Sequence, residues 1–272
     1  MSGAQSNTFG ALLRYWRNAR GLSQLDLANG AEVSSRHLSF LETGRAKPSR
    51  EMILQLSAAL DVPMREQNTL LRAAGFTEHF SEPGIGEALD PLLRSTVDRM
   101  MAQQEPYPLV VMNSHYDIVQ MNGGAMRLFA HAMGERIAQL PAQPNALKLV
   151  FDPAGLRPVM AGWEETAREL LLRLQRGIIQ FPADTALKQL LSSLCGYPEV
   201  PPDWRIPNFE SPSHPTVQFA VQLGEQRYGF LTALTVFNAP QNITIEELRL
   251  ESYFPLDSAT DKLCRQLAAA AG

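Results

Sequence analysis

Hydrophobic positions in the first 76 residues recur at helical spacing and are interrupted by capping residues. One helical stripe follows the i, i+3, i+4, i+7 pattern: Phe9, Leu12, Leu13 and Trp16. The helix that carries this stripe is predicted to end at Gly21. Ser23, with Asp26 three positions later, forms a capping-box pattern, which predicts a second, short helix over 24–30.

Three more helices are predicted from the same kinds of signal. Ser34 is a favourable N-cap for a third helix that runs to Glu42. Ser49 follows a proline and opens a fourth helix, and Pro63 starts a fifth that Gly75 ends. We therefore expect an all-α domain of five short helices over residues 1–76.

The pattern changes after a predicted linker at residues 77–90, which mixes glycine, proline and acids without a clean period. Helical and alternating patterns then follow one another through residues 91–272. The expected elements are helices at 92–101, 122–133, 162–177, 187–194 and after Asp257 or Ser258, and strands at 109–113, 116–122, 217–223, 228–236 and 243–254. The Glu246-Glu247 pair leaves open that the last of these strands is partly loop. This order predicts an α+β domain with a five-stranded antiparallel sheet, as in a PAS-like sensor.

Composition agrees with two globular domains. The chain has 272 residues, of which 45% are hydrophobic and 19% charged, which excludes collagen-like, disordered and coiled-coil proteins. No apolar stretch is long enough to span a bilayer, so we expect no membrane partner and a cytoplasmic location. Cys195 and Cys264 form no metal or redox motif and are expected to be reduced thiols.

The charge is distributed unevenly along the chain. The formal net charge of −4 argues against nucleic acid when taken alone. Residues 1–80, however, carry nine basic and seven acidic side chains, and the remaining 192 residues carry 15 and 21. A local excess of basic residues over 14–50 is typical of a DNA-contacting face, although a solvated helix surface also explains a charge run.

Two short helices joined by a tight turn form a helix-turn-helix arrangement. The strings that carry this pattern are GLSQLDLA at 21–28 and VSSRHLSFLETGRAKPS at 33–49. Over residues 8–76 the chain resembles the XRE family of phage-repressor-like transcriptional regulators. The resemblance implies binding to a double-stranded DNA operator, and specific operators usually need a dimer that reads half-sites about 34 Å apart.

The candidate DNA-binding residues lie at the start of the second helix and on or after the third. They are Gln24, Ser34, Ser35, Arg36, Ser39, Phe40, Thr43, Arg45 and Lys47. We expect Arg36 to read a base, because bidentate contact with guanine is the commonest specific contact. Phe40 either touches thymine methyls or packs on a neighbouring helix. Arg45 and Lys47 are expected to hold phosphates.

Arg17 and Glu42 match positions that form a buried ion pair in similar repressors. Such a pair ties the first helix to the third. If it is buried, loss of one partner costs about 3–5 kcal/mol.

A second resemblance covers residues 90–268. It rests on the order of VMNSHYDIVQMN at 111–122, LKLVFDP at 147–153, Trp204, and His214-Pro215 before the paired strands. These features are similar to the MmyB-like ligand-binding domain found behind XRE domains in bacterial regulators. The resemblance implies a PAS-like fold that binds small, largely apolar ligands, fatty acids among them. The chain departs from the family pattern at Met121, where a tryptophan is common.

Eight side chains are candidates for the lining of a ligand cavity between sheet and helices. They are Met112, Met121, Met126, Phe129, Trp163, Phe219, Phe230 and Leu234. Methionines and aromatic residues suit apolar ligands. Each of these positions is also explained by ordinary core packing.

Motifs for catalysis are absent from the sequence. There is no phosphate-binding loop, no nucleophile elbow and no metal-ligand spacing, and we expect neither an enzyme nor a metal or other cofactor beyond a bound apolar molecule. The acidic pairs 164–165 and 246–247 are interpreted as surface charge. The favoured function is a bacterial, nucleoid-associated homodimeric regulator controlled by an apolar ligand. A DNA-binding scaffold without a ligand, and a fused enzyme with an unrecognised site, remain alternatives.

Overall fold

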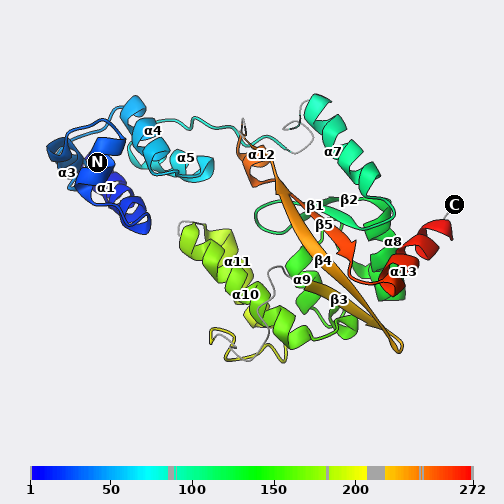
Figure 1. Ribbon diagram of the computed structural model, residues 1–272. Coiled ribbons are helices and arrows are strands. Elements are labelled where there is room, and N and C mark those ends of the chain that lie inside the picture. The colour runs from blue at the N-terminus through cyan, green and yellow to red at the C-terminus, as the bar shows by residue number, and fades with distance from the viewer. Residues whose placement is uncertain are drawn as a thin grey trace. The chain divides into compact units, whose positions relative to one another are not determined.

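The structure is a computed structural model that describes residues 2–84, 89, 91–181, 184–206, 218–238, 240 and 242–270. Figure 1 shows its helices and strands. The chain divides into two compact units, and each is described by itself. The first unit contains residues 1–83 and 240–246, and the second contains residues 84–239 and 247–272. The division at 83/84 falls within the predicted linker, and the His214-Pro215 motif lies outside the described residues.

The first unit is helical, and the five predicted short helices are all present. They are α1 (Ser2–Ala19), α2 (Gln24–Gly30), α3 (Ser35–Glu42), α4 (Arg50–Ala59) and α5 (Met64–Ala73). Their hydrophobic stripes meet in one core, whose largest fully buried side chains include Trp16, Phe9, Leu13, Leu38, Leu41 and Ile53. Burial of this apolar surface holds together helices that are too short to be stable alone.

The caps predicted from sequence set the helix starts. Ser23, Ser34 and Ser49 each accept a hydrogen bond from the backbone N–H three residues later. Pro63, at the start of α5, has no side chain that can do this. Glu246, from the distant part of the chain that belongs to this unit, supplies the missing acceptor, because its Oε2 lies 2.9 Å from the Met64 backbone nitrogen.

The second unit combines helices with one sheet. Its helices are α7 (Pro91–Gln104), α8 (Gly123–Met133), α9 (Ala146–Phe151), α10 (Trp163–Gln180), α11 (Thr185–Cys195) and α13 (Ser258–Ala269), with 3₁₀ turns at Gly134–Gln139 and Arg157–Val159. Its strands are β1 (Leu109–Met112), β2 (Ile118–Met121), β3 (Gln218–Leu223), β4 (Gln226–Val236) and β5 (Arg249–Pro255). Asn122 caps α8 as predicted, and Asp257, one of the two predicted candidates, caps α13.

The five strands form an antiparallel sheet in the order β2-β1-β5-β4-β3. Both predicted hairpins, β1–β2 and β3–β4, are present, which confirms the α+β class of this domain. The predicted strand at 243–254 is wrong in its first half. Residues Ile243–Glu247 form the short helix α12, and the strand starts at Arg249. Asn242 explains the difference, because its side chain accepts from the Ile245 N–H at 3.0 Å and starts a helical turn.

Residues alternate between the two faces of the sheet. On one face, Leu109, Val111 and Leu250 pack with Val97 of α7. On the other face, Val110 and Tyr253 belong to the larger core, to which α8, α9, α10 and α11 contribute. The elements that cover this second face create the site described below.

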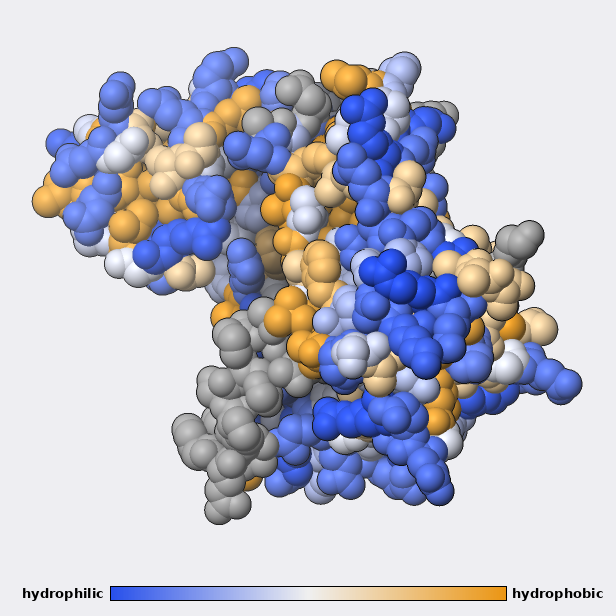
Figure 2. All heavy atoms as spheres, turned by 45° about the vertical axis from the view of Figure 1, so that its right-hand side comes forward, coloured by the Kyte–Doolittle hydropathy of each residue, from blue (hydrophilic) through white to orange (hydrophobic). Residues whose placement is uncertain are grey.

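Hydrophilic side chains dominate the surface shown in Figure 2, and hydrophobic surface occurs there in separate patches. The two cysteines form no disulfide: Cys195 is exposed and Cys264 is buried. Burial raises the pKa of the Cys264 thiol to about 11. Among the described helices, none has the length and hydropathy needed to cross a bilayer.

Candidate nucleic-acid interface and ligand cavity

The turn between α2 and α3 is held by cap and backbone hydrogen bonds. The Asp26 N–H donates to the Ser23 hydroxyl at 3.1 Å, and the Ser23 N–H donates to the Asp26 carboxylate at 3.0 Å, so both halves of the predicted capping box are present. The Val33 N–H donates to the Ala28 carbonyl at 2.8 Å. Glu32, between the helices, has a φ of 52°, which few residues other than glycine adopt. Four residues, 31–34, therefore connect the two helices of the helix-turn-helix arrangement.

A buried ion pair fixes the end of α3 against α1. The Glu42 side chain is 0% exposed, and Arg17 approaches it in a bidentate manner at 2.6 and 3.1 Å. Gln24 Nε2 donates to the same carboxylate at 2.8 Å, and Arg14 Nε lies 3.4 Å away. This geometry confirms the Arg17–Glu42 pair expected from the family resemblance.

The hydrogen bonds decide the charge state of this pair. Burial raises the pKa of Glu42, but hydrogen bonds from Arg17 and Gln24 outweigh burial and hold that pKa below its ordinary value. The hydrogen bond with Glu42 raises the pKa of Arg17. Both groups are therefore charged at neutral pH and satisfy one another.

The predicted DNA-contacting residues divide by exposure. Six of them are exposed: Ser34, Ser35, Arg36, Thr43, Arg45 and Lys47. Gln24, Ser39 and Phe40 are half-buried. Gln24 begins α2, but its amide nitrogen already donates to Glu42. An exposed first turn of α3 with a guanidinium and two hydroxyls can form hydrogen bonds with base edges or phosphates.

Phe40 lies one turn after Arg36 on α3. Phe40 is not one of the described hydrophobic side chains that pack against the core of the first unit. Its ring centroid instead lies 5.5 Å from the guanidinium carbon of Arg36. A cation over an aromatic ring is stabilised by the ring quadrupole, so Phe40 restricts the directions in which Arg36 points.

The backbone N–H groups of residues 43–46, directly after α3, already donate hydrogen bonds within the protein. The Arg45 and Ala46 N–H groups donate to the Phe40 carbonyl at 2.8 and 3.1 Å and end the helix. The Thr43 hydroxyl donates to the Ser39 carbonyl at 2.7 Å. Arg45 and Lys47 are the exposed basic side chains of this segment.

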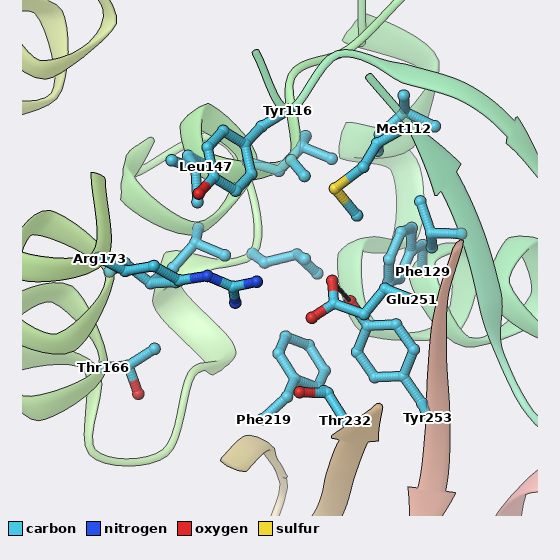
Figure 3. A pocket seen from close by; sticks show the side chains of 17 residues that line it. Met112, Tyr116, Phe129, Leu147, Thr166, Arg173, Phe219, Thr232, Glu251 and Tyr253 are labelled. Atoms are coloured by element: carbon cyan, nitrogen blue, oxygen red, sulfur yellow. Dashed lines mark hydrogen bonds between the residues drawn. The ribbon is translucent and has the colours of Figure 1, made fainter. Parts of the chain in front are cut away.

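A cavity of about 60 Å³ lies in the second unit between the sheet and helices α8, α9 and α10. Figure 3 shows its lining, which is mostly hydrophobic. Residues on β1, β3, β4 and β5 form one wall, and residues on α9 and α10 face them. A concave apolar site with a few polar groups is the usual form of a small-molecule site.

Polar side chains of this cavity gather at one place. Arg173 of α10 points towards the carboxylate of Glu251 of β5, as Figure 3 shows. The Tyr253 hydroxyl donates to Glu251 Oε2 at 3.2 Å, and Thr232 is a second hydrogen-bond partner of this carboxylate. Burial raises the pKa of Glu251, whereas the charge of Arg173 opposes that shift.

Tyr116 reaches the cavity from a strained turn. Its φ is 66°, a left-handed conformation that costs energy for an aromatic residue. Asn145 holds this turn, because its side-chain nitrogen donates to the His115 carbonyl at 2.8 Å and to Asp117 Oδ1 at 2.9 Å. His115 Nε2 lies 2.8 Å from Asp184, the N-cap of α11. The strained turn is thus fixed from two sides and places the Tyr116 ring in the lining.

Three of the eight predicted ligand-binding residues line the cavity: Met112, Phe129 and Phe219. Met121 and Phe230 pack in the adjoining core. Trp163 lies elsewhere, since its Nε1 donates to the Val150 carbonyl at 2.9 Å and the Arg157 guanidinium carbon lies 3.9 Å from its ring centroid.

Met126 and Leu234 do not line the cavity, and both are exposed, at 52% and 45%. Met126 lies on the solvent side of α8. Leu234 shares the inner face of β4 with Phe230 and Thr232. It lies farther along the strand, past Thr232, and is not among the residues that line the cavity. Alternation alone therefore predicts the face of a strand but not how far the covering helices extend.

Arg173 and Glu251, the charged residues that line the cavity, are not among the ligand-binding residues predicted from the sequence. Arg173 lies beside the hydrophobic stripe of Leu170 and Leu174 on α10. Glu251 occupies an inward position of β5, opposite Val110. A charged residue at an inward position of a strand is the signal that identifies such a site.

Within the described residues, no group of three or more histidine, cysteine, aspartate or glutamate side chains is placed to hold a metal ion. The acidic pair 246–247 is more than surface charge, because Glu246 caps α5 and Glu247 accepts from the Ser114 hydroxyl at 2.7 Å.

Comparison with known families agrees with both units. Residues 13–67 match the helix-turn-helix family, and residues 93–267 match the MmyB-like transcription regulator ligand binding domain. A search of curated proteins found no match. The second family covers well over half of the chain. The chain therefore belongs to the MmyB-like transcription regulator family, and it joins an XRE-type DNA-binding domain to a ligand-binding domain.

Proposed function

We propose that this regulator binds a specific operator as a homodimer and that a small, largely apolar ligand in the cavity changes its affinity for DNA, without catalysis. The observation that carries the proposal is the cavity between β-sheet and helices, which lies in the part of the chain that matches the ligand-binding family. Fatty acids and other amphiphiles are the first ligands to consider, because the lining is mostly hydrophobic.

The exposed start of α3 supports the DNA-binding role. We assign to Arg36 a contact with a guanine in the major groove, and to Arg45 and Lys47 contacts with phosphates, because all three side chains are exposed. One such unit contacts few base pairs, so two copies bound to half-sites about 34 Å apart give the specificity that an operator needs.

The size of the cavity supports a coupling to conformation. A volume of about 60 Å³ holds only a few atoms, whereas pockets for drug-sized ligands span about 300–1,000 Å³. Entry of a larger ligand therefore requires β4, β5 or α10 to move. A ligand shifts a conformational equilibrium only when it binds two states differently, and a cavity that must open meets this condition.

The connection between β4 and β5 offers a route for that movement. Both strands contribute to the cavity, and the chain between them enters the first unit as residues 240–246. There the Thr244 hydroxyl donates to the Pro83 carbonyl at 2.7 Å, and Glu246 caps α5. A shift of β4 or β5 therefore pulls on a segment that is built into the DNA-binding unit.

The test begins with the ligand. Purified full-length protein is denatured, its small molecules are extracted and identified by mass spectrometry, and operators are selected from random DNA. The proposal predicts a co-purifying amphiphile and a selected site with two-fold symmetry. A protein that yields neither and binds DNA as a monomer contradicts the proposal.

A scaffold function is favoured by one observation. The end of β4 exposes Leu234 and Val236, at 45% and 58%, and such residues occur in protein interfaces. The scaffold function predicts that the Val236→Ser variant loses a partner or dimer contact while the extract contains no ligand.

A further inference from the structure

The cavity contains one basic and one acidic side chain in otherwise hydrophobic surroundings. Arg173 enters from α10, and Glu251 enters from β5 on the opposite wall. In Figure 3 the guanidinium and the carboxylate point towards each other across the cavity. Among the described residues, no ion pair within 4.0 Å joins them.

The two groups differ in how far they are satisfied. Glu251 receives hydrogen bonds from the Tyr253 hydroxyl, at 3.2 Å, and from Thr232. Arg173 has five N–H donors and interacts with Glu251 only through its charge. The Arg173 side chain is half-buried and its nitrogens are not among the buried polar atoms without a partner, so they keep access to water. A ligand that displaces this water must supply polar atoms in its place, so this end of the cavity favours a ligand with a polar head group.

The pair also limits which polar head group fits. A carboxylate only accepts hydrogen bonds, so it satisfies Arg173 but meets the like charge of Glu251. An ammonium group suits Glu251 but is repelled by Arg173. An amide has a carbonyl that accepts from Arg173 and N–H groups that donate to Glu251, and it brings no charge of its own into the cavity.

We propose that this site selects an amphiphile with an uncharged head group that both accepts and donates hydrogen bonds, such as a fatty amide, over the carboxylate with the same chain. The selection rests on the proposed ligand-sensing function and adds a head-group preference to it. Arg173 and Glu251 determine that preference, and the hydrophobic lining binds the chain.

The test measures the affinity of the full-length protein for three eight-carbon amphiphiles, octanamide, octan-1-ol and octanoate, by isothermal titration calorimetry at neutral pH. Wild-type protein is expected to bind octanamide at least about tenfold more tightly than octanoate, because one unmatched buried polar contact changes affinity by about that factor. Octan-1-ol, with one hydroxyl for two partners, is expected to bind with intermediate affinity.

Two variants assign the preference to its residues. Glu251→Gln removes the like charge and leaves Arg173 in place, so the affinity for octanoate is expected to rise by about tenfold or more. Arg173→Gln is expected to weaken binding of octanoate beyond detection. The matched controls Arg176→Gln, exposed on the same helix, and Glu225→Gln, exposed in the β3–β4 turn, are expected to leave all three affinities unchanged.

The outcomes separate the head-group proposal from ligand sensing itself. Equal affinities for the three compounds, or a wild-type preference for octanoate, overturn the head-group proposal and leave an apolar-ligand sensor intact. An unchanged preference in Glu251→Gln also overturns it. The wild-type comparison alone decides the matter if a variant fails to fold. No binding of any of the three compounds contradicts ligand sensing as well.

Discussion

Each unit of this protein places an arginine and a glutamate in hydrophobic surroundings, and the two pairs differ in one respect. Arg17 and Glu42 lie in bidentate contact, and Gln24 donates to the same carboxylate. Arg173 and Glu251 face one another across a cavity without an ion pair. The first pair is satisfied within the protein and holds two helices together. The second has unused hydrogen-bonding capacity, which is the property of a binding site.

The largest expected effect follows from breaking the satisfied pair. Glu42→Gln leaves the half-buried Arg17 opposite an uncharged, fully buried amide, and we expect a loss of about 3–5 kcal/mol in the free energy of unfolding. Urea unfolding of the full-length protein measures this loss. Glu32→Gln, an exposed control in the turn before α3, is expected to change the free energy of unfolding by less than about 0.5 kcal/mol. A loss in Glu42→Gln no larger than that of the control contradicts the structural role of the pair.

The next effect concerns DNA rather than stability. Arg36→Ala is expected to lower discrimination at one base pair of the operator by about 1–3 kcal/mol, because a bidentate base contact is lost. Lys47→Ala is expected to weaken binding to all sequences alike and to reduce the dependence of affinity on salt. Affinities for a set of single-substitution operators measure both. If Arg36→Ala leaves the ranking of operators unchanged, Arg36 does not read a base.

A smaller effect tests the connection between the strands of the cavity and the first unit. Glu246→Ala removes the carboxylate at the start of α5 and is expected to cost about 1 kcal/mol. Hydrogen exchange at the Met64 amide should become faster. Glu247→Ala, the adjacent control whose partner is Ser114, should leave that exchange unchanged. Equal exchange in the two variants means that Glu246 is not the cap of α5.

The smallest effect is expected from pH in the mild range. The pKa of Glu42 is lower in the folded protein than its ordinary value, because hydrogen bonds from Arg17 and Gln24 outweigh the effect of burial. The stability that its charge contributes is therefore present above the ordinary pKa and is lost as the pH falls through the folded one. The difference in unfolding free energy between wild type and Glu42→Gln should stay constant from pH 7 to about 5 and shrink below about 4. A difference that grows on acidification contradicts this assignment.

Local signals predicted much of this structure. Helix caps and hairpins depend on residues only a few positions apart. The structure contains the predicted hairpins and the predicted caps at Ser23, Ser34, Ser49, Asn122 and Asp257. The sequence predicts a strand where the short helix α12 lies, because Ile243 and Ile245 alternate with polar residues, which is the pattern of a strand.

The polar end of the cavity was not predictable in this way. Arg173 and Glu251 are far apart in the sequence, and only the fold of the second unit brings them to opposite walls of one cavity. The role of Glu246 likewise depends on a segment that returns to the first unit after more than 150 residues. Long-range packing decides these functions, whereas sequence patterns report local structure.

The most direct test of ligand control is the operator affinity of the full-length protein after its small molecules have been extracted and the protein refolded, with and without the extract added back. The account predicts a change in affinity of about 5-fold or more on addition of the extract, the usual range for coupling between two sites. It also predicts that the extract of a mock preparation has no effect. Equal operator affinities in the ligand-free and ligand-loaded states contradict the account.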